Sequence, residues 1–99
     1  MIRHIVAWSF KEGFSPEENA QHTAKIKAGL EALPQIIDGI CELNVHIDML
    51  PSANRDAVLN SLFESKEALA NYQMHPEHKK VSAFVGSVMT ERVCLDYME

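Results

Sequence analysis

The stretch YQMHPEH, residues 72–78, holds two of the five histidines, one of the two tyrosines and a proline. Proline lacks an N–H and is excluded from helix interiors, but it is favoured at the first position of a helix. The stretch therefore predicts a helix that ends near Met74, a kink at His75 and a second helix that begins at Pro76. Such a kink can turn Tyr72, His75 and His78 toward one volume, where a hydroxyl and neutral imidazoles could serve as an acid/base pair.

The same residues also fit a purely structural interpretation. Tyr72 could be a packed aromatic residue with its hydroxyl at the surface, His75 could cap the second helix, and His78 could be a solvated residue of its first turn. Short motifs often match by chance, so both interpretations stay open from these residues alone.

Alternating apolar residues predict strands on both sides of this stretch, over 2–10, 40–47, 56–63 and 91–97. His4 lies in the more hydrophobic face of the first of these strands, and a buried histidine there needs a hydrogen-bond partner. His22 and His46 are expected at the surface.

The first helix has a clear beginning in the sequence. Ser15 is the expected N-cap, Pro16 the first helical residue, and Glu18 completes a capping box. Pro34 and Gly39 are expected to end this helix. Ser65 is expected to cap the helix before the kink, and apolar residues at helical spacing follow Pro76.

The order strand, helix, strand, strand, broken helix, strand predicts an α+β fold of the ferredoxin-like βαββαβ type. In this fold, the helices cover one face of an antiparallel sheet. The first, third and last strands carry apolar residues on both faces, which is more than two helical segments can cover. We therefore expect the remaining face to meet a second copy of the chain in a two-fold homodimer.

Length and composition narrow the class of protein. The 99 residues are expected to form one domain, 1–99. No apolar run approaches the roughly 20 residues that span a bilayer, and the N-terminus has no signal-peptide pattern, so we expect a cytoplasmic protein. The net charge of −5 argues against a nucleic-acid partner and against an anionic membrane surface.

Cys41 and Cys94 are far apart in the sequence and belong to no CxxC motif. They are expected to be buried free thiols, although a single disulfide in an oxidising compartment stays open. The histidines form no zinc-like i, i+4 pair with acidic support, so no metal site and no cofactor are expected.

Over nearly its whole length, the sequence also resembles the stress-responsive A/B barrel, or Dabb, domain family. The resemblance is carried by His4 and its strand, Pro34, the segment Asp56 to Ser65, residues 72–78 and the final pair Asp96-Tyr97. It implies a ferredoxin-like protomer whose sheet pairs with that of its twin in a dimeric α/β barrel, with the helices outside.

One branch of this family resembles a plant polyketide cyclase, which closes a linear polyketide by an intramolecular aldol reaction without a cofactor. By this resemblance, His78 corresponds to the base, Tyr72 to its tyrosine and His4 to the first-strand histidine. An aldol closure needs a base next to a carbonyl and a donor for the oxyanion, and these residues can supply both.

The chain departs from that branch at three positions. Ala57 stands in place of a third-strand histidine, Ile26 in place of a pocket tyrosine, and Trp8 in place of a smaller pocket residue. Trp8 is therefore expected to fill much of the cavity. The resemblance of some plant members to cation binders points to backbone carbonyls around Leu30, Leu33 and Ile36.

These arguments predict a small, largely apolar pocket in each protomer for an apolar or aromatic ligand, lined by His4, Val6, Trp8, Leu59, Tyr72, His78, Val81, Met89 and Cys94. The first functional hypothesis is a small-molecule binder or a cofactor-independent enzyme, with His78 as base and Tyr72 as donor. The alternatives are a structural dimer module without chemistry, with Trp8 closing the pocket, and a cofactor-independent small monooxygenase of the related dimeric α/β barrel group.

Overall fold

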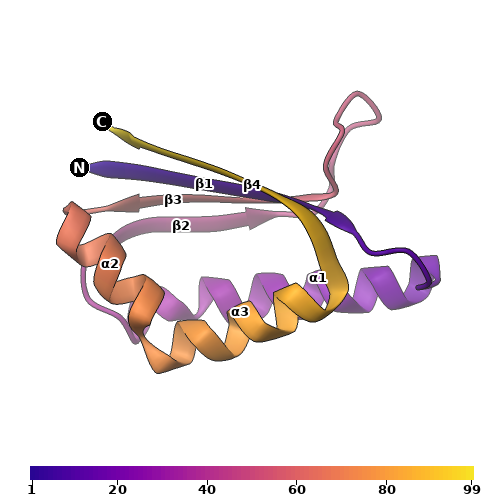
Figure 1. Ribbon diagram of the computed structural model, residues 1–99, viewed down its shortest axis with the longest axis horizontal. Helices are drawn as coiled ribbons and strands as arrows, with labels where there is room; N and C mark the ends of the chain where they lie inside the picture. Colours follow the sequence, from indigo (N-terminus) through magenta and orange to yellow (C-terminus); the bar gives the residue numbers. More distant parts are fainter.

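Strands and helices follow one another along the chain in the predicted order (Figure 1). The structure is a computed structural model that describes residues 1–99. Its elements are β1 (Ile2–Phe10), α1 (Pro16–Glu31), the 3-10 helix η1 (Leu33–Gln35), β2 (Ile40–His46), β3 (Ala57–Phe63), α2 (Lys66–Met74), α3 (Pro76–Val88) and β4 (Met89–Met98). None of the helices combines the length and apolar character needed to cross a bilayer.

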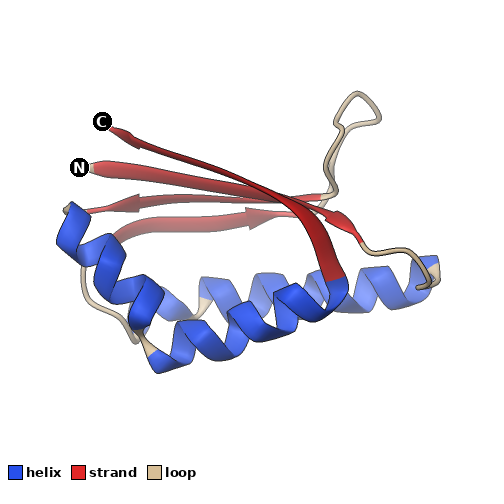
Figure 2. Cartoon of the chain, in the orientation of Figure 1, coloured by secondary structure: helices blue, strands red, loops and turns tan.

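The strands form one antiparallel sheet in the order β2-β3-β1-β4, and all helices lie on one side of it (Figure 2). The central strand β1 pairs with β3 and β4, so that His4 lies opposite Ser61 on one side and opposite Asp96 on the other. The two chain ends lie side by side, and the Glu99 N–H donates to the Met1 carbonyl at 2.9 Å. The predicted α+β, ferredoxin-like fold is confirmed.

The first helix begins as its sequence predicts. The Glu18 N–H donates to the Ser15 hydroxyl at 3.1 Å, and the Ser15 N–H donates to the Glu18 carboxylate at 3.0 Å. This reciprocal pair satisfies two N–H groups that the helix start leaves without partners. The helix ends at Glu31, and Pro34 lies within the 3-10 turn that follows.

The helix break at His75 also occurs where the sequence predicts it. His75 has an extended backbone (φ −66°, ψ 134°), and Pro76 is the first residue of α3. The His75 Nδ1 accepts the Glu77 N–H at 3.1 Å, which caps α3. His75 therefore does not converge with Tyr72 and His78 as one interpretation expected, and the capping interpretation is confirmed for this residue.

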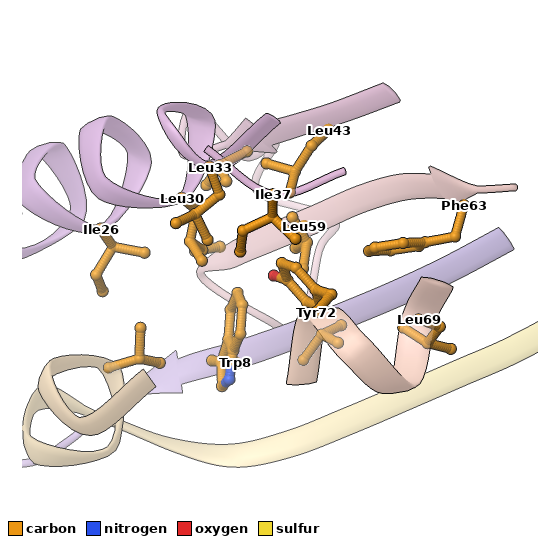
Figure 3. Close-up of a cluster of buried hydrophobic side chains, with 14 of the residues drawn as sticks. Trp8, Ile26, Leu30, Leu33, Ile37, Leu43, Leu59, Phe63, Leu69 and Tyr72 are labelled. Carbon is orange, nitrogen blue, oxygen red and sulfur yellow. The ribbon is translucent and has the colours of Figure 1, made fainter. Parts of the chain in front are cut away.

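The hydrophobic core fills the space between the helices and the sheet (Figure 3). β1 contributes Trp8, α1 contributes Ile26 and Leu30, and α2 contributes Leu69 and Tyr72, all of which are buried. Each fully buried Leu or Ile side chain stabilises the fold by about 1.5–3 kcal/mol relative to exposure. The core therefore holds all three helices against the same face of the sheet.

The opposite face of the sheet, called the open face below, has no helix over it. On the edge strand β4, it exposes Val93, Leu95 and Tyr97 by 37%, 54% and 49%. Ile5 and Ala7 of β1 lie beside them in the register and are half-buried. The apolar residues that the sequence places on both faces of the strands are thus sheltered on one face only.

Cys41 and Cys94 are free but exposed, so the prediction that they are buried is wrong. Cys41 lies within a register shift between Ile40 and Glu42 that breaks the inward alternation of β2. Cys94 lies on β4, an edge strand whose length beyond Met89 is exposed. His46 is exposed as expected, whereas His22 is half-buried.

Gly39 supplies a backbone conformation and a close approach that no other residue fits. Its φ is +91°, and an added Cβ would lie 2.6 Å from the Ala68 Cβ. Gly13 has a similar φ of +100° but open space around it. We expect Gly39→Ala to lower the free energy of unfolding by about 2–4 kcal/mol and Gly13→Ala by about 1 kcal/mol. Urea titrations would measure both, and equal losses would contradict the clash.

Candidate functional site

A cavity of about 240 Å³ lies on the side of the sheet that faces the helices. Most residues that the sequence predicted for a pocket line it: His4, Val6, Trp8, Leu59, Tyr72, His78 and Met89. Trp8 forms part of the wall, and the cavity remains beside it. Further lining residues that the sequence analysis missed are Leu30, Gln73, Ser82, Val85, Gly86, Thr90, Glu91 and Arg92.

Helical periodicity explains part of what was missed. Ser82 and Val85 follow His78 by about one and two turns of α3, so they share its face. Val81 is three residues after His78 and so lies at the edge of the same face, but its side chain contacts α1. It packs over Gly29 of α1 and lines a separate groove between α1 and α3. The expectation that Val81 lines the cavity is therefore wrong.

Cys94 also lies outside the set of residues that line the cavity. Its Sγ is 3.9 Å from His4 Nδ1 and 3.5 Å from Asp96 Oδ2. The pKa of its thiol is raised by burial and by the negative charge of Asp96, and Arg92 opposes this shift. Cys94 thus belongs to a cluster of polar side chains, with His4 and Asp96, where β1 pairs with the edge strand β4.

Tyr72 is fully buried and points from α2 into the core, beside Trp8 and Leu59 (Figure 3). Its ring packs at 4.9 Å from Phe63 and at 4.2 Å from the ring of His78. Its hydroxyl is buried and has no hydrogen-bond partner. Burial raises the pKa of Tyr72 well above its usual range, so the group is a neutral hydrogen-bond donor at physiological pH.

His78 lies in the first turn of α3, half-buried, and its Nδ1 is also buried without a partner. Burial lowers the pKa of His78, the Gln73 backbone carbonyl opposes the shift, and the positive potentials of His4, Arg92 and His75 add to it. His78 is therefore a neutral imidazole near pH 7, which is the form that can accept a proton.

The Tyr72 hydroxyl and the His78 Nδ1 are unusual because an unsatisfied buried polar group costs about 1–3 kcal/mol. Here two such groups come from adjacent rings on the wall of one cavity. The proline break places them there, since it lets α2 and α3 each point one aromatic ring at the same space. Together they offer a donor and an acceptor to whatever enters.

His4 has the partner that its buried position requires. It is 2% exposed, and its Nδ1 pairs with the Asp96 carboxylate of β4. An ionised carboxylate can only accept, so the His4 Nδ1 carries the proton and the other ring nitrogen is free to accept. The Ser61 hydroxyl donates to the His4 carbonyl at 2.7 Å.

Comparison with known proteins supports the resemblance seen in the sequence. The model of the family described as the stress responsive A/B barrel domain matches residues 2–99. The stress-response A/B barrel domain-containing protein HS1 of Arabidopsis thaliana is 31% identical over 101 residues, which cover 97% of this chain and 87% of that protein.

Two of the solved structures that share the fold come from Bacteroides fragilis and Passiflora edulis. A dimeric ferredoxin-like protein of unknown function from Bacteroides fragilis is 28% identical, with a TM-score of 0.92, over 99% of this chain and 95% of that chain. A hydroxynitrile lyase from Passiflora edulis is 22% identical, with a TM-score of 0.74, over 97% and 90% of the two chains. At that identity, the second match shows the fold alone.

The missing partner of the Tyr72 hydroxyl leads to a stability prediction. Tyr72→Phe removes an unsatisfied buried group and keeps the ring, so we expect the free energy of unfolding to stay equal or to rise by up to about 1 kcal/mol. Tyr72→Ala should lower it by about 3–5 kcal/mol through the cavity it leaves. Urea unfolding of both variants gives the answer, and a clear loss in Tyr72→Phe would show that the hydroxyl holds the fold together.

The lowered pKa of His78 leads to a second prediction. The imidazole of the unfolded chain, with a pKa near 6.5, should take up a proton before that of the folded chain as pH falls. NMR titration of the histidine Cε1–H signals should therefore give a midpoint below about 6.5 for His78, assigned as the signal absent in His78→Gln. As pH falls below about 6.5, the free energy of unfolding of the wild type should also decrease more than that of His78→Gln. A midpoint above about 6.5 would contradict the burial of the ring.

Proposed function

Since this chain belongs to the stress responsive A/B barrel domain family, we propose that it is a homodimer that binds a small carbonyl compound in the cavity and performs acid/base chemistry on it without a cofactor. One observation carries the proposal. The buried Tyr72 hydroxyl and the buried His78 Nδ1 lack partners, belong to rings whose centroids are 4.2 Å apart, and come from residues that line the same cavity. A ligand with a carbonyl oxygen and an adjacent C–H would satisfy both.

The size and lining of the cavity set the class of ligand. Cavities of about 150 Å³ accept benzene, so a volume of about 240 Å³ suits a single aromatic ring with small substituents. Val6, Leu59 and Trp8 supply apolar walls for the ring. Tyr72 of α2 and His78 of α3 supply polar groups from the helix side, which would orient the carbonyl toward Tyr72.

The chemistry follows from the protonation states. Neutral His78 would accept a proton from the carbon next to the carbonyl, and the Tyr72 hydroxyl would donate to the oxygen as it gains negative charge. The carbanion equivalent so formed could attack a second carbonyl of the same molecule. Tyr72 would keep its proton in this scheme, because its raised pKa makes it a hydrogen-bond donor and a poor acid.

The alternatives have less support. A structural module would gain nothing from a tyrosine hydroxyl that is buried without a partner, and the cavity beside Trp8 remains open to a ligand. No cavity residue distinguishes the monooxygenase alternative. Oxygen uptake with a quinol-type compound would favour the monooxygenase over the proposed carbonyl chemistry.

The homodimer is proposed from the open face. Val93, Leu95 and Tyr97 present neighbouring apolar side chains to solvent, and an apolar face of this kind is usually covered by a partner. The Bacteroides fragilis protein of the same fold is dimeric. A two-fold arrangement of the open faces would bury the same residues of both copies and leave the helices outside.

Solvent hydrogen exchange tests the acid/base proposal without knowledge of the natural ligand. An aryl methyl ketone such as 4-hydroxyacetophenone fits a single-ring cavity and carries exchangeable C–H groups. We expect the wild type in D2O to exchange the methyl hydrogens faster than buffer alone does. His78→Gln should abolish this acceleration, because no base remains, and Tyr72→Phe should lower it by about 10²-fold or more.

Val81→Ala is the matched control, since Val81 lies on the same helix but faces α1. Its exchange rate should equal that of the wild type once the folded fraction is taken into account. If wild type and His78→Gln exchange at the rate of buffer while NMR shows the ketone bound, the protein is a binder without this chemistry.

A charge on the open face should separate the protomers. Leu95 is 54% exposed on that face, so Leu95→Lys should convert the dimer to a folded monomer at micromolar concentration, as measured by sedimentation velocity. Met74→Lys is the control, because Met74 is 68% exposed on α2, on the helix side. A wild type that sediments as a monomer would overturn the dimer.

A further inference from the structure

A second polar site lies beside the cavity, where β1 and β4 pair. His4, Cys94 and Asp96 place an imidazole nitrogen, a thiol sulfur and a carboxylate oxygen within 4.8 Å of one another. The sheet register brings them together, because Asp96 lies opposite His4 and Cys94 lies opposite Val6, the next inward-facing residue of β1. Residues from opposite ends of the chain thus present three different ligand atoms on one face of the sheet.

We propose that His4, Cys94 and Asp96 bind a divalent transition metal ion, with Zn²⁺ as the ion that their chemistry favours. The donor set of one nitrogen, one sulfur and one oxygen suits a borderline-soft ion. The site shares only His4 with the lining of the cavity, and it includes neither Tyr72 nor His78.

The distances fit a tetrahedral site with one adjustment. With zinc–ligand bonds of about 2.0–2.3 Å, neighbouring ligand atoms of a tetrahedron are separated by about 3.4–3.6 Å. The Cys94 Sγ lies 3.5 Å from Asp96 Oδ2 and 3.9 Å from His4 Nδ1. The Asp96 carboxylate now pairs directly with His4 Nδ1. Asp96 is exposed on an edge strand, so its carboxylate can move away from His4. A metal ion bound to both residues would then replace the proton of their hydrogen bond.

The surroundings decide how the ion would be held. His4 is buried and fixed by the sheet, whereas Cys94 and Asp96 are exposed, so the site is open to solvent on one side. Three protein ligands and an open fourth position are typical of zinc sites that bind water or an exchangeable ligand. Arg92 lies on the same face of β4 and would weaken the binding of a cation, although it also favours the thiolate.

Cobalt provides a direct readout, because Co²⁺ bound to a thiolate gives a charge-transfer absorption in the near ultraviolet. Reduced wild-type protein titrated with Co²⁺ should develop this band to one equivalent per chain, and Zn²⁺ should remove it. Cys94→Ser should lose the band and weaken Zn²⁺ binding by more than about tenfold, measured by competition with a chromophoric chelator. Asp96→Asn should keep the band but weaken binding by a similar factor.

Cys41→Ser is the matched control, because Cys41 is the other free and exposed cysteine of the chain. It should bind both metals as the wild type does. The proposal is overturned if the wild type shows no cobalt–thiolate band, if Cys94→Ser keeps it, or if Cys41→Ser loses it. Circular dichroism of each variant confirms that it is folded, and ketone exchange by Tyr72 and His78 variants is tested separately.

Discussion

The break in the helix at His75 and Pro76 is the constraint on which the candidate site depends. A continuous helix would carry Tyr72 and His78 at different angles around one axis, whereas the break lets α2 and α3 direct both rings into the same space. The break is stable because Pro76 has no N–H to lose and because His75 caps the helix that follows. The backbone therefore fixes the distance between the proposed donor, Tyr72, and the proposed base, His78, before a ligand binds.

The two faces of the sheet differ in how their side chains are covered. The helix side is packed into a core, except where the cavity leaves two polar atoms without partners. Those atoms lower the stability of the protein, and a site that binds a polar ligand explains why they are tolerated. The open face instead keeps apolar side chains in water, which favours association. The proposed ligand site and the proposed dimer interface therefore lie on opposite faces of the sheet.

The edge strand β4 links these features. It carries Leu95 and Tyr97 on the open face, and Cys94 and Asp96 on the helix side, because successive side chains of a strand alternate. Asp96 pairs with His4, whose ring lines the cavity. β4 therefore contributes to the cavity both through His4 and directly, since its first residues, Met89 to Arg92, are part of the lining.

The sequence by itself determined the order of the elements, the capping box at Ser15, the helix break at Pro76 and seven of the fifteen residues that line the cavity. These features depend on local rules of capping, periodicity and alternation, which a single chain segment obeys. Comparison of the helix phase after His78 would also have found Ser82 and Val85, whereas the contact of Val81 with α1 depends on how the two helices pack.

Only the tertiary structure decided what depends on contacts between distant segments. It exposed Cys41 and Cys94, left the Tyr72 hydroxyl and the His78 Nδ1 without partners, and set His4 against Asp96 and Cys94. Burial of an edge strand depends on where the helices end, and the pairing of residues 4 and 96 depends on the register between the first and last strands. Neither the burial of β4 nor the pairing of residues 4 and 96 can be read from the neighbouring residues in the sequence.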